Sequence, residues 1–192
     1  MPGTRQALDR IAVFCGARTG IRPQYVELAK EFGVALARRG VGLVYGAGGV
    51  GVMGAVADAA FSGGASVTGV IPHRLYEREL PRRSRGEVFV VRTMHERKAR
   101  MYKLSKGFAV LPGGLGTLDE LMEVATWNQL GFHQKPIVLI NHEGFFDPLA
   151  AMLDHIVKEG FLSPQERSCM DMAIGVEEAL DLLGCAPESV AL

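Results

Sequence analysis

Short apolar runs that alternate with longer amphipathic segments constrain the fold of this chain more than any other feature. The apolar runs cover residues 11–15, 41–45, 66–71, 87–91, 107–111 and 136–140. Apolar residues recur at helical spacing in segments 22–39, 52–62, 94–105, 115–130, 148–158 and 176–183. Strands that are apolar on both faces are typical of parallel sheets buried between helices. The sequence therefore predicts a Rossmann-like α/β fold, with a doubly wound, mainly parallel sheet flanked by helices on both faces.

The alternation is interrupted between residues 73 and 86, where the composition predicts a polar loop. Loops of that length in a compact domain are often functional. We find no linker, repeat or low-complexity tract, and 192 residues suit one domain. We therefore expect a single nucleotide-binding domain over residues 1–192, with loose ends at 1–9 and 187–192.

Charge balance and residue counts exclude several classes of function. The 21 basic residues equal the 21 acidic ones, so net charge indicates no nucleic-acid-binding face. No apolar run approaches the roughly 20 residues that span a bilayer, and residues 1–10 lack the apolar core of a signal peptide. We expect a cytoplasmic protein without a membrane partner. The three cysteines and five histidines show no metal-binding spacing, so we expect no metal, and Cys15 should be a buried small apolar side chain.

A glycine-rich turn, Leu111-Pro-Gly-Gly-Leu-Gly-Thr-Leu-Asp-Glu120, follows the fifth apolar run. Its glycines permit positive φ and let a ligand approach the backbone N–H groups closely. A helix beginning at Thr117 would direct its unpaired N–H groups and its positive dipole end at the same space. The pattern predicts an anion site, most often for phosphate, with Glu120 one helical turn inside it.

Two interpretations of Glu120 are open. Thr117-Leu-Asp-Glu120 has the T-x-x-E spacing of a capping box, in which Glu120 would only bond back to the helix start. The alternative is a functional carboxylate beside a bound anion. Asp119 is more simply explained as a first-turn acid that suits the helix dipole.

A second glycine turn, Gly46-Ala-Gly-Gly-Val-Gly51, has the G-x-G-x-x-G pattern of dinucleotide sites. The next strand ends in Val70-Ile-Pro-His73, without the acidic residue that holds an adenosine ribose. We therefore do not expect NAD, and interpret the turn as part of a mononucleotide crevice or as tight helix packing. The glycine turns after Cys15, Tyr45 and Leu111 should converge on one crevice, because ligands bind beyond the carboxyl ends of parallel strands.

Arg97 and Lys98 lie near the start of the helix after the fourth strand, close to the same crevice. Arg97 would offer a two-pronged contact to phosphate or ribose, and Lys98 a point charge. A solvated charged helix face, with Glu96 and Arg100 as an i,i+4 pair, is the alternative. Met94 is expected in the core.

These motifs together resemble the LOG (Lonely Guy) family, the cytokinin riboside 5′-monophosphate phosphoribohydrolases, which are often mislabelled lysine decarboxylases. P-G-G-x-G-T-x-x-E at residues 112–120, joined to the Arg97-Lys98 pair, is a specific signature. The likeness also takes in residues 70–72, 126–131 and 135–136, and so spans nearly the whole chain.

The resemblance implies hydrolysis of the N-glycosidic bond in N6-substituted adenosine 5′-monophosphates and AMP, which releases free base and ribose 5-phosphate. It implies a nucleoside 5′-monophosphate substrate, no cofactor, and a homodimer with the site close to its interface. Arg97 and Glu120 are the implied catalytic pair. The implied substrate contacts are Glu79, Arg97, Lys98, Gly113, Gly114, Leu115, Gly116, Thr117, Leu118, Asp119, Glu120 and Thr126.

The first glycine turn departs from the family pattern. That turn commonly reads C-G-S-S in the family, whereas here it is Cys15-Gly-Ala-Arg18. Ala17 and Arg18 would alter base or phosphate preference if they touch the nucleotide, and would change little if the position only caps the next helix.

Two rival functions have different requirements. A non-catalytic nucleotide or cofactor carrier of the same fold would keep the glycines but would not need Arg97 together with Glu120. A lysine decarboxylase would need pyridoxal phosphate on a lysine, and Lys98, Lys103 and Lys106 lie on or after a charged helix with no separate Schiff-base context. The sequence therefore favours the phosphoribohydrolase.

Overall fold

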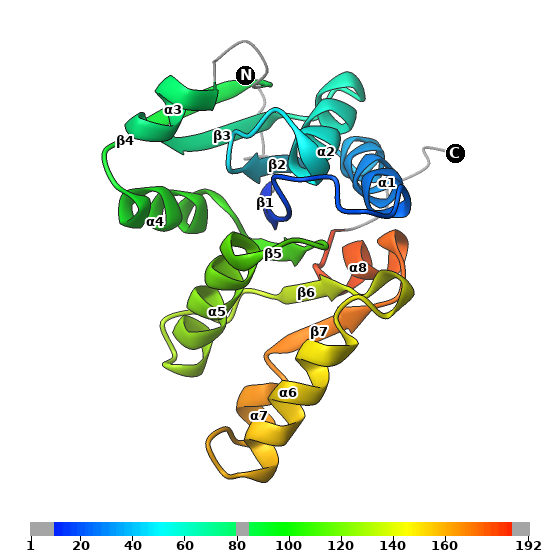
Figure 1. The fold of residues 1–192 in the computed structure, drawn as a ribbon, viewed down its shortest axis with the longest axis vertical. Helices are drawn as coiled ribbons and strands as arrows, with labels where there is room; N and C mark the ends of the chain where they lie inside the picture. Colours follow the sequence, from blue (N-terminus) through cyan, green and yellow to red (C-terminus); the bar gives the residue numbers. More distant parts are fainter. Residues whose placement is uncertain (1–9, 80–84, 186–192) are drawn as a thin grey trace, which may run out of the picture.

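The computed structural model describes residues 10–79 and 85–185, in which seven parallel strands form one sheet (Figure 1). The strand order is β4-β3-β2-β1-β5-β6-β7. The strands are β1 (Arg10–Phe14), β2 (Gly42–Tyr45), β3 (Val67–Pro72), β4 (Glu87–Val91), β5 (Gly107–Val110), β6 (Ile137–Ile140) and β7 (Met170–Ala173). The order confirms the predicted doubly wound sheet, because the chain adds strands in one direction from β1 and then in the other from β5.

Helices cover both faces of this sheet, as predicted. One face packs against α1 (Gln24–Arg38), α2 (Gly51–Ser62) and α8 (Val176–Leu182), and the other against α4 (Met94–Leu104), α5 (Leu115–Gln129) and α6 (Asp147–Lys158). The remaining helices of the described residues are α3 (His73–Glu79), η2 (His142–Gly144) and α7 (Pro164–Arg167). Buried aliphatic and aromatic side chains fill both layers, because the strands are apolar on both faces.

The helix ends follow the local sequence. Gly40 follows α1 with φ of +67°, the left-handed conformation that a glycine after a helix adopts without strain. Thr93 caps α4 by accepting a hydrogen bond from the Glu96 N–H, and Glu96 in turn accepts one from the Arg92 N–H. The start of α4, which carries Arg97, is therefore well defined.

Two parts of the sequence prediction were wrong. The polar loop expected over 73–86 begins instead as α3, whose Leu75 and Tyr76 pack against the core; residues 80–84 lie outside the described part. β7 was missed, because this four-residue edge strand, Met-Asp-Met-Ala, has only one neighbouring strand and exposes Asp171. Its pairing with β6, rather than its own apolar pattern, defines it.

Candidate active site

A cavity of about 610 Å³ opens at the carboxyl end of the sheet. Its walls include Gly16 after β1, Gly46 after β2 and Gly113 after β5, which confirms that the three glycine turns converge. β1 and β5 are parallel neighbours in the sheet. After β1 the chain continues to β2 on one side, and after β5 it continues to β6 on the other side. Such a reversal leaves a crevice between the two turns, which is where doubly wound sheets bind ligands.

The helix after β5 begins at Leu115, as the predicted segment 115–130 has it, and not at Thr117, from which the dipole argument started. Gly114 is the N-cap and α5 starts at Leu115, so Thr117 lies inside the first turn and the capping-box interpretation of Thr117 and Glu120 is wrong. Among the described residues, no hydrogen-bond acceptor meets the N–H groups of Leu115, Gly116 and Thr117. These groups face a cavity with the positive end of the helix dipole behind them, which suits an anion.

The glycines of this turn are required because side chains would not fit or would block the cavity. They are not required for positive φ, contrary to the sequence prediction. None of Gly113, Gly114 and Gly116 has positive φ. A Cβ on Gly113 would lie 2.1 Å from the Thr117 Oγ1 and 2.8 Å from the Gly16 N, so only glycine fits between the two turns. Gly114 and Gly116 border open space, where the absence of a side chain leaves room for a ligand.

Arg97 and Glu120 meet inside the cavity as a buried ion pair. The Nη2 of Arg97 lies 3.7 Å from the Glu120 Oε1, and the two side chains are 10% and 8% exposed. Arg97 also donates from Nε to the Val70 carbonyl at 3.1 Å and from Nη2 to the Gly46 carbonyl at 3.4 Å. The ends of β2, β3 and α5 therefore fix both groups, which rules out the solvated helix face as an account of Arg97.

Burial raises the pKa of Glu120 to about 7, because the low-polarity surroundings disfavour its charged form. The positive charge of Arg97 opposes this effect and is the second largest influence on the pKa. A carboxyl with a pKa near neutrality inside a ligand cavity is a frequent mark of a catalytic group.

The second glycine turn is shaped for packing rather than for a dinucleotide. The N–H groups of Val52 and Met53, at the start of α2, already donate to the carbonyls of Arg18 and Gly16 at 3.3 and 3.0 Å. In dinucleotide sites those helix-start groups hold the pyrophosphate. At Gly51, where φ is +69°, a Cβ would collide with the backbone of Ala17, so this glycine lets the β1 turn rest on α2.

Lys98 lies beside this cavity, but its ammonium group pairs with two carboxylates of α5. Its Nζ lies 2.8 Å from the Glu123 Oε2 and 3.2 Å from the Asp119 Oδ2, and the hydrogen bond to Glu123 is the largest influence that raises its pKa. The predicted Glu96–Arg100 pair does not form: Glu96 pairs with Arg92, and Arg100 stacks over the Phe89 ring.

The cavity brings together most of the residues expected to bind substrate. Its walls include Arg97, Gly113, Gly114, Leu115, Gly116, Thr117, Asp119 and Glu120. Lys98, Leu118 and Thr126 are not among them: Leu118 packs toward the core, and the exposed Thr126 donates its hydroxyl to the Met122 carbonyl. Glu79 ends α3, and its side chain lies outside the described part. Substrate contact by all the residues expected to bind substrate stays a prediction.

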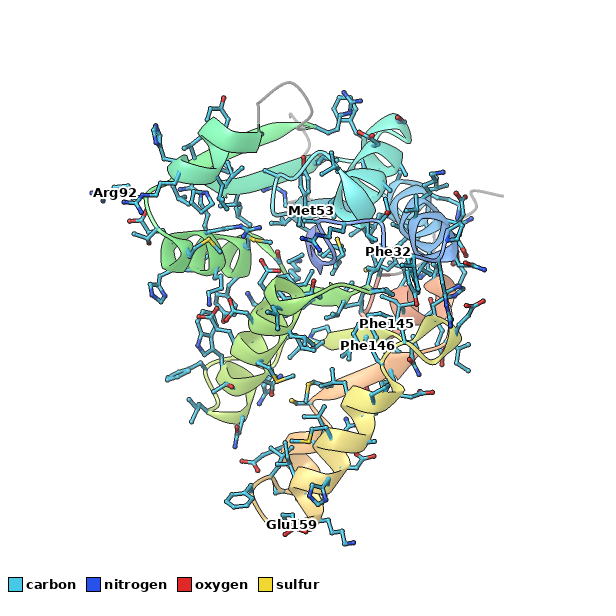
Figure 2. All side chains as sticks on the ribbon, in the orientation of Figure 1. Phe32, Met53, Arg92, Phe145, Phe146 and Glu159 are labelled. Carbon is cyan, nitrogen blue, oxygen red and sulfur yellow. The ribbon has the colours of Figure 1, made fainter. Side chains whose placement is uncertain are left out.

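Other residues that line the cavity were missed by the sequence analysis. Tyr25 and Phe145 meet edge to face with ring centroids 5.4 Å apart, and Met94, predicted in the core, is 43% exposed at the cavity wall. Figure 2 labels Phe145, which follows β6, and Met53 of α2, another residue of the wall. Cys15 is buried as predicted, and burial raises the pKa of its thiol, so it remains protonated.

Neither a metal site nor a membrane span is found in the described ranges. Residues 10–79 and 85–185 contain no cluster of three or more His, Cys, Asp or Glu side chains placed to hold a metal ion. Within the same ranges, no helix combines the length and hydrophobicity needed to cross a bilayer.

The doubly wound sheet, with an open helix start and a buried ion pair in the cavity at its carboxyl end, defines a protein of the Rossmann-like α/β class. The family model described as "Possible lysine decarboxylase" matches residues 53–183. Cytokinin riboside 5′-monophosphate phosphoribohydrolase LOG1 from Arabidopsis thaliana is 47% identical over 174 residues, 91% of this chain and 82% of that protein. The LOG enzyme of rice, Oryza sativa subsp. japonica, is 47% identical over 163 residues, 85% of this chain and 67% of that protein. The chain belongs to the LOG family.

A more distant likeness concerns the fold alone. The molybdenum cofactor binding protein from the phototrophic bacterium Rippkaea orientalis superimposes with a TM-score of 0.68 at 21% identity, covering 92% of this chain and 96% of that one. This similarity supports the Rossmann-like architecture and says nothing of the ligand.

Proposed function

We propose that this protein hydrolyses the N-glycosidic bond of N6-substituted adenosine 5′-monophosphates and of AMP, releasing free base and ribose 5-phosphate. Relatives that are 44–47% identical carry the name of this activity. The buried Arg97–Glu120 pair beside the open start of α5 is the observation that carries the proposal. A carrier protein could use the anion site, but it would not need a carboxylate placed next to it.

Glu120 supports the departure of the base by its negative charge. Cleavage at C1′ builds positive charge on the ribose, and a carboxylate held in a low-polarity cavity stabilises such a transition state strongly. The carboxylate can also accept a hydrogen bond from a ribose hydroxyl or from the attacking water. Because the pKa of Glu120 is about 7, kcat/KM should rise as pH increases through neutrality.

Arg97 keeps the Glu120 carboxylate ionisable and in place. The guanidinium is itself anchored by the Val70 and Gly46 carbonyls, so it can hold position while substrates enter and leave. The start of α5 would bind the 5′-phosphate, which lies away from the bond that is cleaved. The energy of this contact would hold the sugar in place against Glu120.

The test is release of free base from AMP and N6-isopentenyl AMP, compared with the matching ribosides. Glu120→Gln should lower kcat on the order of 100-fold or more, because the charge that stabilises the transition state is lost. Glu159→Gln, an exposed change just after α6, is the matched control and should keep parental kcat. Parental rates in the Glu120→Gln protein would remove Glu120 from this role.

The assembly and the location of the protein also belong to this proposal. We propose a homodimer with the active site close to the subunit interface, as the family resemblance implies, and a cytoplasmic location, as expected from the sequence. Sedimentation velocity of the purified protein tests the dimer directly.

A further inference from the structure

The proposed phosphate-binding part of the cavity needs a positive charge that is not already paired with a carboxylate. The charged side chains that line it are Arg18, Arg97, Asp119 and Glu120. Arg97 is engaged by Glu120 and by two backbone carbonyls, and the neighbouring Lys98 is engaged by Asp119 and Glu123. A phosphate monoester carries a charge of about −1.5 to −2 at neutral pH, which needs a partner that is not already neutralised.

Among the described residues, Arg18 has no carboxylate partner, unlike Arg97 and Lys98. Its side chain is exposed and lines the cavity, and no acidic side chain or hydrogen-bond acceptor of the described residues meets its guanidinium. Its backbone is held firmly, because the Arg18 carbonyl accepts from the Val52 N–H. The side chain is therefore free to contact a ligand while its base is fixed.

The turn that carries Arg18 lies against the turn that forms the start of α5. The Gly16 N–H donates to the Pro112 carbonyl at 3.1 Å, and a Cβ on Gly16 would lie 3.3 Å from the Gly113 Cα. Arg18 therefore borders the space that the N–H groups of Leu115 to Thr117 face. A phosphate in this space would contact both the N–H groups of the helix start and the Arg18 guanidinium. Arg suits phosphate because it can donate two parallel hydrogen bonds to it.

Tyr25 supplies a second group to the same wall. The Tyr25 ring packs against Gly20, where a Cβ would lie 2.8 Å from Cδ2, and its edge contact with Phe145 fixes the ring further. No hydrogen-bond partner of its hydroxyl is found among the described residues. The hydroxyl remains available as a donor to an oxyanion.

We propose that Arg18 is a phosphate-binding residue of this protein and sets its preference for 5′-phosphorylated substrates over free nucleosides. The identity of the ligand rests on the proposed function, whereas the presence of an anion site rests on the geometry alone. Of the two outcomes that the sequence left open for Arg18, the structure favours contact with the nucleotide.

The test measures binding of ribose 5-phosphate and inorganic phosphate to the intact protein by calorimetry, which needs no turnover. Arg18→Ala should weaken both about 10- to 100-fold, as expected for loss of a charge-assisted hydrogen bond, and Arg18→Lys should fall between the parent and Arg18→Ala. Lys158→Ala, which removes an exposed charge at the end of α6, should bind like the parent. Adenine binding should be equal in all four proteins.

Kinetics separate the proposal from a general loss of function. Arg18→Ala should raise KM for AMP by a similar factor while its slow turnover of adenosine stays parental. If Arg18→Ala binds ribose 5-phosphate as the parent does, or if the parent binds neither phosphate compound, the proposal is overturned. If the parent releases no base from AMP but its phosphate binding depends on Arg18, the hydrolase function fails and the phosphate site stands.

Discussion

At the scale of single residues, the burial of the Glu120 carboxyl in the cavity lowers the stability of the folded protein at neutral and high pH. Glu120 is 7% exposed, and its pKa of about 7 lies well above the usual value near 4.5. The folded protein therefore holds this proton more tightly than the unfolded chain does. The penalty is absent well below pH 4.5, where both states are protonated, grows between about pH 4.5 and 7, and stays constant at higher pH.

Glu120→Gln should therefore stabilise the protein at high pH while it removes activity. We expect its free energy of unfolding to exceed that of the parent by up to about 3 kcal/mol at pH 8 and to be close to it at pH 5. Denaturant titrations at both pH values measure the difference. A stability gap that is constant with pH would show that Glu120 is not ionised at a cost in the folded protein.

At the scale of elements, the turns are built so that one element leaves space for the side chain of another. Gly46, after β2, has no side chain because Arg97 of α4 occupies that space: a Cβ would lie 1.9 Å from the Arg97 Nη2. Gly33 of α1 packs closely against α2, where a Cβ would lie 2.5 Å from the Val56 carbonyl oxygen. A side-chain end can move aside, whereas a helix backbone resists.

Alanine at Gly46 should mainly lower activity, whereas alanine at Gly33 should mainly lower stability. Gly46→Ala should displace Arg97, lowering kcat/KM for AMP by at least about tenfold, with a change in unfolding free energy of about 1 kcal/mol. Gly33→Ala should cost about 1–3 kcal/mol or more, because two helices must separate, while kcat of the folded protein stays parental. Steady-state kinetics and denaturant unfolding of both variants check this, and the same pattern in both would contradict the argument.

At the scale of the whole molecule, a buried arginine joins the first helix to the last. The Arg39 side chain is 5% exposed and donates to the Asp181 and Glu177 carboxylates and to the Cys185 carbonyl. Arg38 pairs with the same Glu177 but is 57% exposed. One sheet includes every described strand, and this contact holds α1 against α8. We propose that residues 1–192 form one domain that unfolds as a unit.

Arg39→Ala should lower the free energy of unfolding by about 2–3 kcal/mol, because the Cys185 carbonyl and the Asp181 carboxylate lose the Arg39 donor and Glu177 keeps only the exposed Arg38. Arg38→Ala should cost less than about 1 kcal/mol, as is usual for an exposed ion pair. Thermal unfolding followed by circular dichroism and by tryptophan fluorescence measures both effects. Two separate transitions in either variant would contradict the single domain.

Much of this protein follows from its sequence alone. Short apolar strands between amphipathic helices predicted the doubly wound sheet, and the glycine turns predicted where its crevice lies. Both are local patterns, because strand and helix periodicities repeat within a few residues. The P-G-G-x-G-T-x-x-E signature with Arg97-Lys98 also identified the family correctly.

Only the tertiary structure decided how the side chains at that crevice are used. Spacing left Glu120 divided between a capping box and a functional acid. The start of α5 at Leu115 excluded the capping box, and the fold placed Glu120 beside Arg97, whose guanidinium is held by the carbonyls of Val70 in β3 and Gly46 after β2. In the same arrangement Lys98 pairs with Glu123, and Arg18 has no ion-pair partner among residues 10–79 and 85–185. These outcomes depend on which strands lie side by side, and that order is set by packing across the whole sheet rather than by any one segment.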